Sequence, residues 1–173
     1  NILNNFQIHD ALIKKMAKDE ERNLCIISHI IDLVNKGKST IVFACSLEHS
    51  KLLNEVCILL NIRCASIDDK TSYSSRKLYI KKFKNKEIDV IFNYGVLSTG
   101  FDAPNTNAIL IARPTTSPIV YSQMLGRGLR GLEVKGNKVA GFTNAVLRKV
   151  EIITPGDTSL MTGEQMEKTQ LLE

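Results

Sequence analysis

The chain has 173 residues, of which 43% are apolar and 24% charged, with no tryptophan, and this length suits one globular domain with a buried core. No apolar run approaches the roughly 18 residues of a membrane helix and no signal-peptide pattern is present, which argues against a membrane partner. A formal net charge of +5 favours a polyanionic partner without demonstrating one.

The N-terminal part predicts one long helix over residues 10–36. Its apolar stripe repeats at helical spacing, and Gly37 stands where such a helix would end. The stripe consists of Leu24, Ile27, Ile31 and Val34.

From residue 39 onward, short β-branched and apolar runs alternate with helical patterns. Ser46 is the predicted N-cap of the first of these helices, and Asp68 opens a polar loop that leads to a basic helix over 76–84. The predicted strands are 39–45, 63–67, 89–94 and 107–112, with a helix over 119–130 and weaker strand patterns at 139–147 and 150–154.

This alternation predicts an α/β fold in three layers, a parallel sheet with helices on both faces. Ligands of such sheets gather at the carboxyl ends of the strands. Ser46, Asp68, residues 99–102 and residues 113–115 all follow predicted strands, so we expect them along one edge.

The four cysteines, Cys25, Cys45, Cys57 and Cys64, form no C-x-x-C pair, and the histidines offer no matching ligand pairs. Buried free thiols in a reducing cytosol are therefore favoured over a zinc site or a disulfide framework. We accordingly expect a cytoplasmic protein with no metal ligands of its own.

The tripeptide GKS at 37–39 is similar to the end of a phosphate-binding P-loop. The full motif needs a glycine where Asp32 stands, and it needs a strand before it and a helix after it. Here a helix precedes the tripeptide and a strand follows, so a C-terminal helix glycine is the better interpretation.

The stretch QMLGRGLRG, residues 123–131, places Arg127 and Arg130 three positions apart among glycines. Guanidinium groups suit phosphate oxygens, and glycine permits a close backbone approach. A phosphate-binding arginine pair without a P-loop suggests that the rest of a nucleotide site lies on another domain.

TGFDAP at 99–104, followed by Gln123, Gly126, Arg127 and Arg130, resembles motifs V and VI of superfamily 2 helicases. Residues 39–53 resemble motif IV and the helix after it, and the resemblance covers roughly residues 20 to 131. It implies the second RecA-like domain of such a motor. Within the superfamily, GFDAP and QMLGRGLRG resemble most the DEAH-like group around restriction-enzyme motor subunits and bacterial DNA-repair helicases.

The resemblance implies roles for the motif residues. ATP would lie in a cleft with an N-terminal RecA-like domain of the same protein, which would supply the P-loop and the Mg²⁺ carboxylates. Arg130 would be the arginine finger, with Arg127 as its partner and Gln123 bonded to phosphate or the attacking water. Gly100, Asp102 and Gly126 would contact the nucleotide, and the Asp102 carboxylate suits a ribose hydroxyl.

The implied nucleic-acid track crosses the same edge. Thr99 and Ser46 are candidates for phosphate oxygens, and Arg113 and Thr115 are weaker ones, for which a turn and a helix cap explain the residues about as well. DNA is the expected partner, with RNA left open.

We expect a helical segment over 1–37 that packs on the domain, the RecA-like domain over 38–154, and a tail or short helix over 155–173. Since the chain starts at Asn1, we expect a piece of a longer ATP-dependent helicase or translocase, inactive alone. Two alternatives stay open: a non-catalytic nucleic-acid-binding module of the same fold, and an unrelated Rossmann-like enzyme. ACSLEHS lacks the glycine-rich turn that such an enzyme needs.

Overall fold

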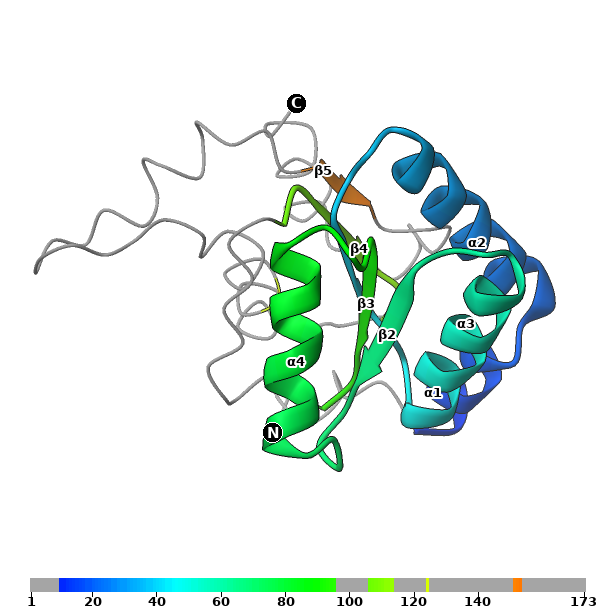
Figure 1. Ribbon diagram of the computed structural model, residues 1–173. Coiled ribbons are helices and arrows are strands. Elements are labelled where there is room, and N and C mark those ends of the chain that lie inside the picture. Colours follow the sequence, from blue (N-terminus) through cyan, green and yellow to red (C-terminus); the bar gives the residue numbers. More distant parts are fainter. Residues whose placement is uncertain (1–9, 96–105, 114–123, 125–150, 154–173) are drawn as a thin grey trace, which may run out of the picture.

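The computed structural model describes residues 10–95, 106–113, 124 and 151–153, and these form a five-stranded parallel sheet with helices on both faces (Figure 1). The strands are β1 (Thr40–Phe43), β2 (Cys64–Ile67), β3 (Val90–Asn93), β4 (Ala108–Ile111) and β5 (Glu151–Ile153). The helices are α1 (Asp10–Ala17), α2 (Glu20–Asn35), α3 (Leu47–Leu59) and α4 (Tyr73–Lys84). The predicted three-layer α/β fold is confirmed.

The strand order is β2-β3-β1-β4-β5, and every neighbouring pair is parallel. Strand β1 lies at the centre, where Thr40 is in register with Val90 of β3 and with Ala108 of β4. Four predicted strands and the weaker pattern at 150–154 therefore all contain an observed strand, whereas residues 139–147 lie outside the described part. Because the strands are parallel, their carboxyl ends share one edge of the sheet.

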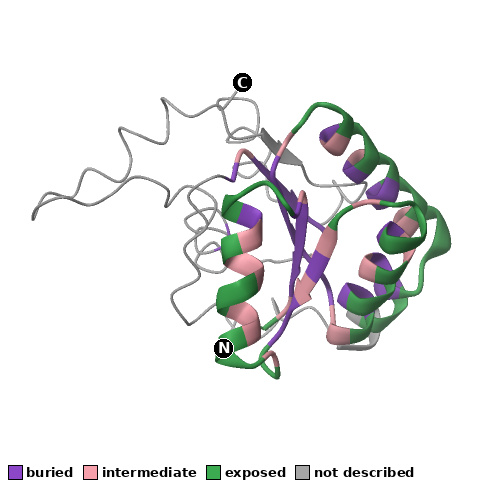
Figure 2. Cartoon of the chain, viewed as in Figure 1, coloured by how far each residue is buried: buried purple, intermediate pink, exposed green. Residues whose placement is uncertain are grey.

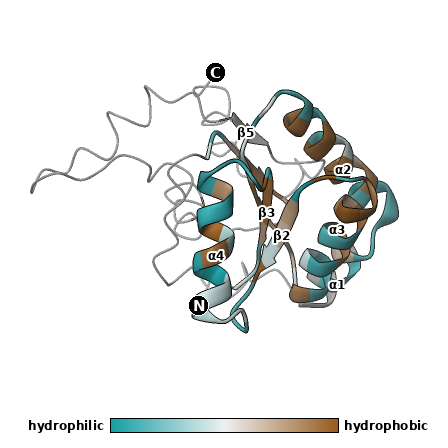
Figure 3. Ribbon diagram, in the orientation of Figure 1, coloured by the Kyte–Doolittle hydropathy of each residue, from teal (hydrophilic) through white to brown (hydrophobic). Residues whose placement is uncertain are grey.

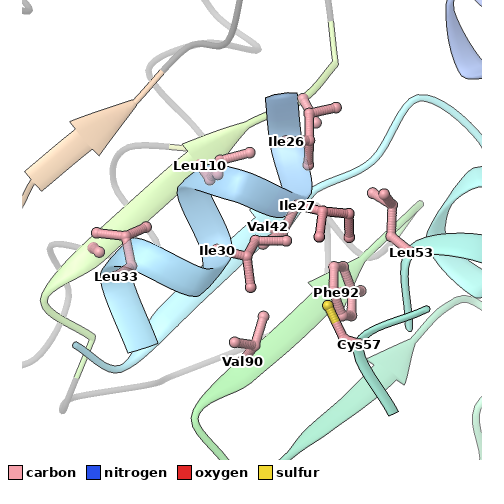
Figure 4. Packing of buried hydrophobic residues seen from close by; sticks show 12 residues of the cluster. Ile26, Ile27, Ile30, Leu33, Val42, Leu53, Cys57, Val90, Phe92 and Leu110 are labelled. Atoms are coloured by element: carbon pink, nitrogen blue, oxygen red, sulfur yellow. The ribbon is translucent and has the colours of Figure 1, made fainter. Parts of the chain in front are cut away.

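Side chains of β1 alternate between two apolar cores, one on each face of the sheet. Figure 2 shows the buried strands between helices that are exposed on their outer sides. Ile41 and Phe43 face the core covered by α4, which contains Phe83. Val42 faces the core covered by α2 and α3. Figure 4 shows how the second core closes, with Ile30 of α2 and Leu53 of α3 packed over the strands. Burial on both faces explains why most residues of the central strands are apolar.

The prediction of one helix over 10–36 is wrong, because α1 ends at Ala17 and α2 begins at Glu20. The side chain of Asp19 accepts a hydrogen bond from the backbone N–H of Arg22 at 3.0 Å and so caps a new helix. Acidic residues in the first turn of α2 also suit the positive end of its dipole.

The predicted apolar stripe of this helix is also partly wrong. Leu24 is 70% exposed and Ile31 38% exposed, although Ile27 is buried as expected. The buried face consists of Ile26, Ile27, Ile30 and Leu33. Half of the residues of α2 are apolar, and at about 100° per residue they form more than one possible stripe, so the sequence alone does not say which stripe packs on the sheet. Figure 3 shows the apolar residues along α2.

Three helices end in the same way, with one residue at positive φ. Gly37 ends α2 at φ 69°, where its N–H bonds the Val34 carbonyl and the Lys38 N–H bonds the Leu33 carbonyl, each at 2.9 Å. This is a Schellman motif, and it confirms that GKS ends a helix. Asn61 and Lys86 hold the corresponding positions after α3 and α4.

Candidate functional site

Ser46, Asp68 and Arg113 lie just beyond the carboxyl ends of β1, β2 and β4. Since these strands are parallel, the three residues lie along the same edge of the sheet, as predicted. The other predicted site residues lie outside the described residues, and their roles stay predictions. They are Thr99, Gly100, Asp102, Thr115, Gln123, Gly126, Arg127 and Arg130.

Ser46 is the N-cap of α3, as predicted. Its hydroxyl oxygen accepts from the backbone N–H of His49 at 3.1 Å, and its own backbone is extended. Glu48, in the first turn, is exposed, and hydrogen bonds from its own backbone N–H and the Ser46 side chain lower the pKa of its carboxyl. A phosphate at Ser46 would therefore meet the positive end of a helix but also a nearby carboxylate.

Arg113 is half-exposed directly after β4. No ion pair or hydrogen bond ties its side chain to another residue within the described ranges. Arg113 thus lies at the carboxyl edge of the sheet, while Ala112 before it is buried.

The loop after β2 is held by its own side chains. The Asp68 carboxylate accepts from the backbone N–H of Lys70 at 2.9 Å and from the Thr71 hydroxyl at 3.1 Å. Arg76 of α4 donates back to the carbonyls of Asp68 and Thr71, at 3.2 and 3.5 Å. Asp68 and Arg76 thus fix the conformation of this part of the edge.

A partly buried polar network joins α2, α3 and the end of β4, and the sequence did not predict it. Arg22 of α2 donates to the Ala112 carbonyl and lies 3.8 Å from the Cys45 sulfur. Cys45 in turn donates through its thiol to the same carbonyl at 3.0 Å. Nothing in the sequence around Arg22 indicates these contacts, because its partners are 23 and 90 residues away in the chain.

His49 extends this network. Its Nδ1 accepts the Cys45 backbone N–H at 3.1 Å, so the ring proton is on Nε2, which donates to the Asn23 side-chain oxygen at 2.9 Å. The Asn23 amide then donates to the Ala17 carbonyl at 3.0 Å. Burial, and secondarily the charge of Arg22, lower the pKa of His49 to about 4. The ring is therefore neutral near pH 7 and fixes the start of α2 against α3.

The four cysteines are free. Cys45 and Cys57 are buried, Cys64 is half-buried, and Cys25 is exposed. A hydrogen bond with the Cys64 side chain, together with burial, raises the pKa of Cys57, so this thiol stays protonated. Within the described ranges, no group of three or more His, Cys, Asp or Glu side chains could hold a metal ion.

One residue of the QMLGRGLRG stretch is described. Met124 is helical, has no exposed surface, and belongs to the core on the α4 side of the sheet together with Phe43 and Ile91. Met124 thus packs on the face of the sheet that α4 also covers.

Among the described helices, none is long and apolar enough to cross a lipid bilayer.

Comparisons with known proteins identify the family. Residues 22–131 match the model of the helicase conserved C-terminal domain. The ATP-dependent helicase IRC3 of Saccharomyces cerevisiae is 31% identical over 131 residues, which cover 75% of this chain and 17% of that protein. A mitochondrial ATP-dependent helicase, irc3 of Schizosaccharomyces pombe, is 36% identical over 118 residues, 68% of this chain and 20% of that protein. The chain thus spans about a fifth of the length of these relatives.

Solved structures show the same fold. The structure of T4 UvsW superposes with a TM-score of 0.60 at 17% identity, over 88% of this chain and 38% of that one. The Hef helicase domain of Pyrococcus furiosus gives 0.56 at 19% identity, over 92% of this chain and 30% of that one. The chain belongs to the helicase C-terminal domain family and is a RecA-like C-terminal domain of the superfamily 2 helicases.

Proposed function

We propose that this chain is the second motor domain of an ATP-dependent DNA helicase or translocase, and that its arginines complete an ATP site shared with an N-terminal RecA-like domain of the same protein. Within the superfamily, we place it in the DEAH-like group with restriction-enzyme motor subunits and DNA-repair helicases. The family match and the ATP-dependent relatives support the class.

The burial of Met124 is the observation that carries the arginine-finger role. An α-helix turns by about 100° per residue. In the predicted helix over 119–130, Gln123, Arg127 and Arg130 would then fall on one flank, about 60° to 120° from Met124. With Met124 in the core, this flank would point along the sheet rather than into it. All three polar side chains could therefore reach a single ligand.

The described residues agree with a domain that contributes charged side chains to a nucleotide site but has no phosphate-binding loop at GKS. Gly37 ends a helix, so GKS forms no phosphate loop. The P-loop and the Mg²⁺ ligands would come from the N-terminal domain, and the bound Mg²⁺ would neutralise developing phosphate charge. Arg130 would stabilise the charge on the transferred phosphoryl group, Arg127 would hold the γ-phosphate, and Gln123 would position phosphate or water. Gly100, Asp102 and Gly126 would contact the nucleotide.

DNA would cross the carboxyl edge, positioned by Ser46, Thr99, Arg113 and Thr115 through phosphate oxygens. Such contacts fix a strand without selecting its bases. The relatives include RNA helicases, such as a DEAD-box ATP-dependent RNA helicase of Oryza sativa, so the test includes both nucleic acids.

The test is ATP hydrolysis by the full-length protein with and without DNA or RNA. We expect Arg130→Ala to lower the turnover about a thousandfold or more, the usual effect of removing an arginine finger. Glu55→Ala is the control, because Glu55 is exposed on α3 and has no proposed contact, and it should leave the turnover unchanged.

Two outcomes would contradict the proposal. Unchanged hydrolysis by Arg130→Ala would favour the alternative, a non-catalytic nucleic-acid-binding module of the same fold. Rapid turnover by this chain alone would show that it holds a complete ATP site.

A further inference from the structure

Asn93, the last residue of β3, carries a buried side-chain amide that forms no hydrogen bond with any of the described residues. The residue is 1% exposed, and its backbone carbonyl accepts from the Ala44 N–H at 3.0 Å. Neither the oxygen nor the nitrogen of its side chain has a hydrogen-bond partner among the described residues. Buried polar groups are nearly always paired, and a primary amide offers two donors and an acceptor. This amide therefore calls for a physical explanation.

The surroundings of Asn93 within the sheet are apolar. Strand alternation puts its side chain on the same face as Ile91, in the core on the α4 side. Its neighbours in register are Phe43 of β1 and Ile67 of β2, and both are buried in that core. Met124 belongs to the same core. The sheet thus supplies packing for Asn93 but no polar partner.

Asn93 also lies near the middle of the carboxyl edge of the sheet. Strand β3 lies between β2 and β1, so Asn93 is flanked by the strand ends from which Asp68 and Ser46 follow. The chain that leaves β3 after Asn93 leads within ten residues to Gly100 and Asp102, the proposed nucleotide contacts.

We propose that Asn93 is a positioning residue whose amide gains partners only when the motor binds ATP and nucleic acid. This inference rests on the proposed motor function. A neutral group that both donates and accepts suits peptide N–H and C=O groups, whereas phosphate oxygens only accept. The expected partners are therefore backbone groups at the carboxyl edge, and pairing with them would hold that edge in its active geometry.

The proposal has a thermodynamic consequence. A group that is unpaired in the free state and paired in the bound state destabilises the first relative to the second, and so shifts the equilibrium toward the bound state. Replacing the amide by an apolar group of similar shape removes this bias. The free protein should become more stable while the active state becomes harder to reach.

The experiment compares Asn93→Leu with Asn93→Thr in the full-length protein. For Asn93→Leu we expect the Tm of this domain's unfolding transition in the nucleotide-free protein to rise by about 2–4 °C, the scale for relieving one unpaired group in a domain of this size. The Tm gain on adding a non-hydrolysable ATP analogue and DNA should shrink. The DNA-stimulated kcat should fall roughly tenfold with a smaller change in KM, because the lost bond is made only in the active state.

The hydroxyl of Asn93→Thr can donate and accept, and it should restore part of kcat. Thr40→Val is the matched control. Thr40 is also a buried polar residue, but it lies at the amino end of β1, away from the carboxyl edge, so this change should leave kcat as it was.

Three results would overturn the proposal. A fall in the nucleotide-free Tm of Asn93→Leu, or its failure to fold, would mean that the amide is already satisfied, for example by a buried water. An unchanged kcat would mean that the amide does not position the site. If the wild-type protein hydrolyses no ATP with either nucleic acid, the motor function itself fails, and this inference fails with it.

Discussion

His49 shows how one buried side chain makes stability depend on pH. Because burial and Arg22 lower the pKa of His49 to about 4 from its usual 6.5, the unfolded chain takes up the proton first as the pH falls. The stabilisation is complete above pH 6.5 and is lost progressively down to about pH 4. Its full size is about 3 kcal/mol, at 1.36 kcal/mol per pKa unit.

We therefore expect the free energy of unfolding of the wild type to fall more steeply between pH 7 and pH 4.5 than that of His49→Gln. A glutamine can still accept from the Cys45 N–H and donate to Asn23 but does not titrate. Urea unfolding at several pH values measures the difference. His29→Gln, a half-exposed position on α2, serves as the control. Parallel pH curves for wild type and His49→Gln would contradict the assignment.

The network around His49 also marks a limit of prediction at the scale of single residues. Ser46 was predicted as a helix cap because a cap is a local pattern, a serine before an amphipathic run. Arg22 and His49 were not predicted, because their contacts join residues far apart in the chain and exist only after α2 and α3 pack on the sheet. Long-range polar contacts of this kind leave no periodic signal in the sequence.

At the scale of the element, the start of α3 combines a structural role with a proposed ligand contact, and two substitutions separate them. Ser46→Ala removes the acceptor for the His49 N–H and should cost about 1 kcal/mol of stability. Ser46→Asp keeps an excellent cap, so stability should hold, but its added charge should repel phosphate. Thermal unfolding and DNA affinity are measured for both variants.

The matched control for this pair is Ser72→Asp, which makes the same change at the N-cap of α4. It should leave DNA affinity unchanged. Equal affinity for wild type and Ser46→Asp would show that Ser46 acts only as a cap.

The strands and the helices differed in how well their patterns predicted them. Buried parallel strands need apolar side chains on both faces, so runs such as TIVF and VIFN mark them directly. In α2 the apolar residues form overlapping stripes, and only the packing shown in Figure 4 selects Ile26, Ile30 and Leu33. The break before α2 depends on one cap, Asp19, inside a pattern that was helical on both sides.

For the whole molecule, parallel pairing does the most to assemble the candidate site. It brings Ser46, Asp68, Asn93 and Arg113 to one edge from four strands spread over much of the chain. The sequence predicted this edge because strand–helix alternation implies a parallel sheet. The sequence could not predict which edge residues form hydrogen bonds within the protein. Asp68 bonds to Lys70 and Thr71 of its own loop, whereas the Arg113 side chain forms no hydrogen bond with another described residue.

The net charge of +5 favours contact with DNA but does not say where the DNA lies. Two surfaces could carry it: the carboxyl edge with Arg113 and the basic face of α4 with exposed Lys77. Each phosphate contact contributes about 0.7 to 0.9 to the slope of log affinity against log salt. If DNA crosses the edge, Arg113→Gln in the full-length protein should reduce that slope by about this amount, and Lys77→Gln should leave it unchanged. Fluorescence anisotropy over a range of salt concentrations measures both slopes. The opposite result, a slope that falls for Lys77→Gln and stays constant for Arg113→Gln, would move the track to α4 and remove Arg113 from the site.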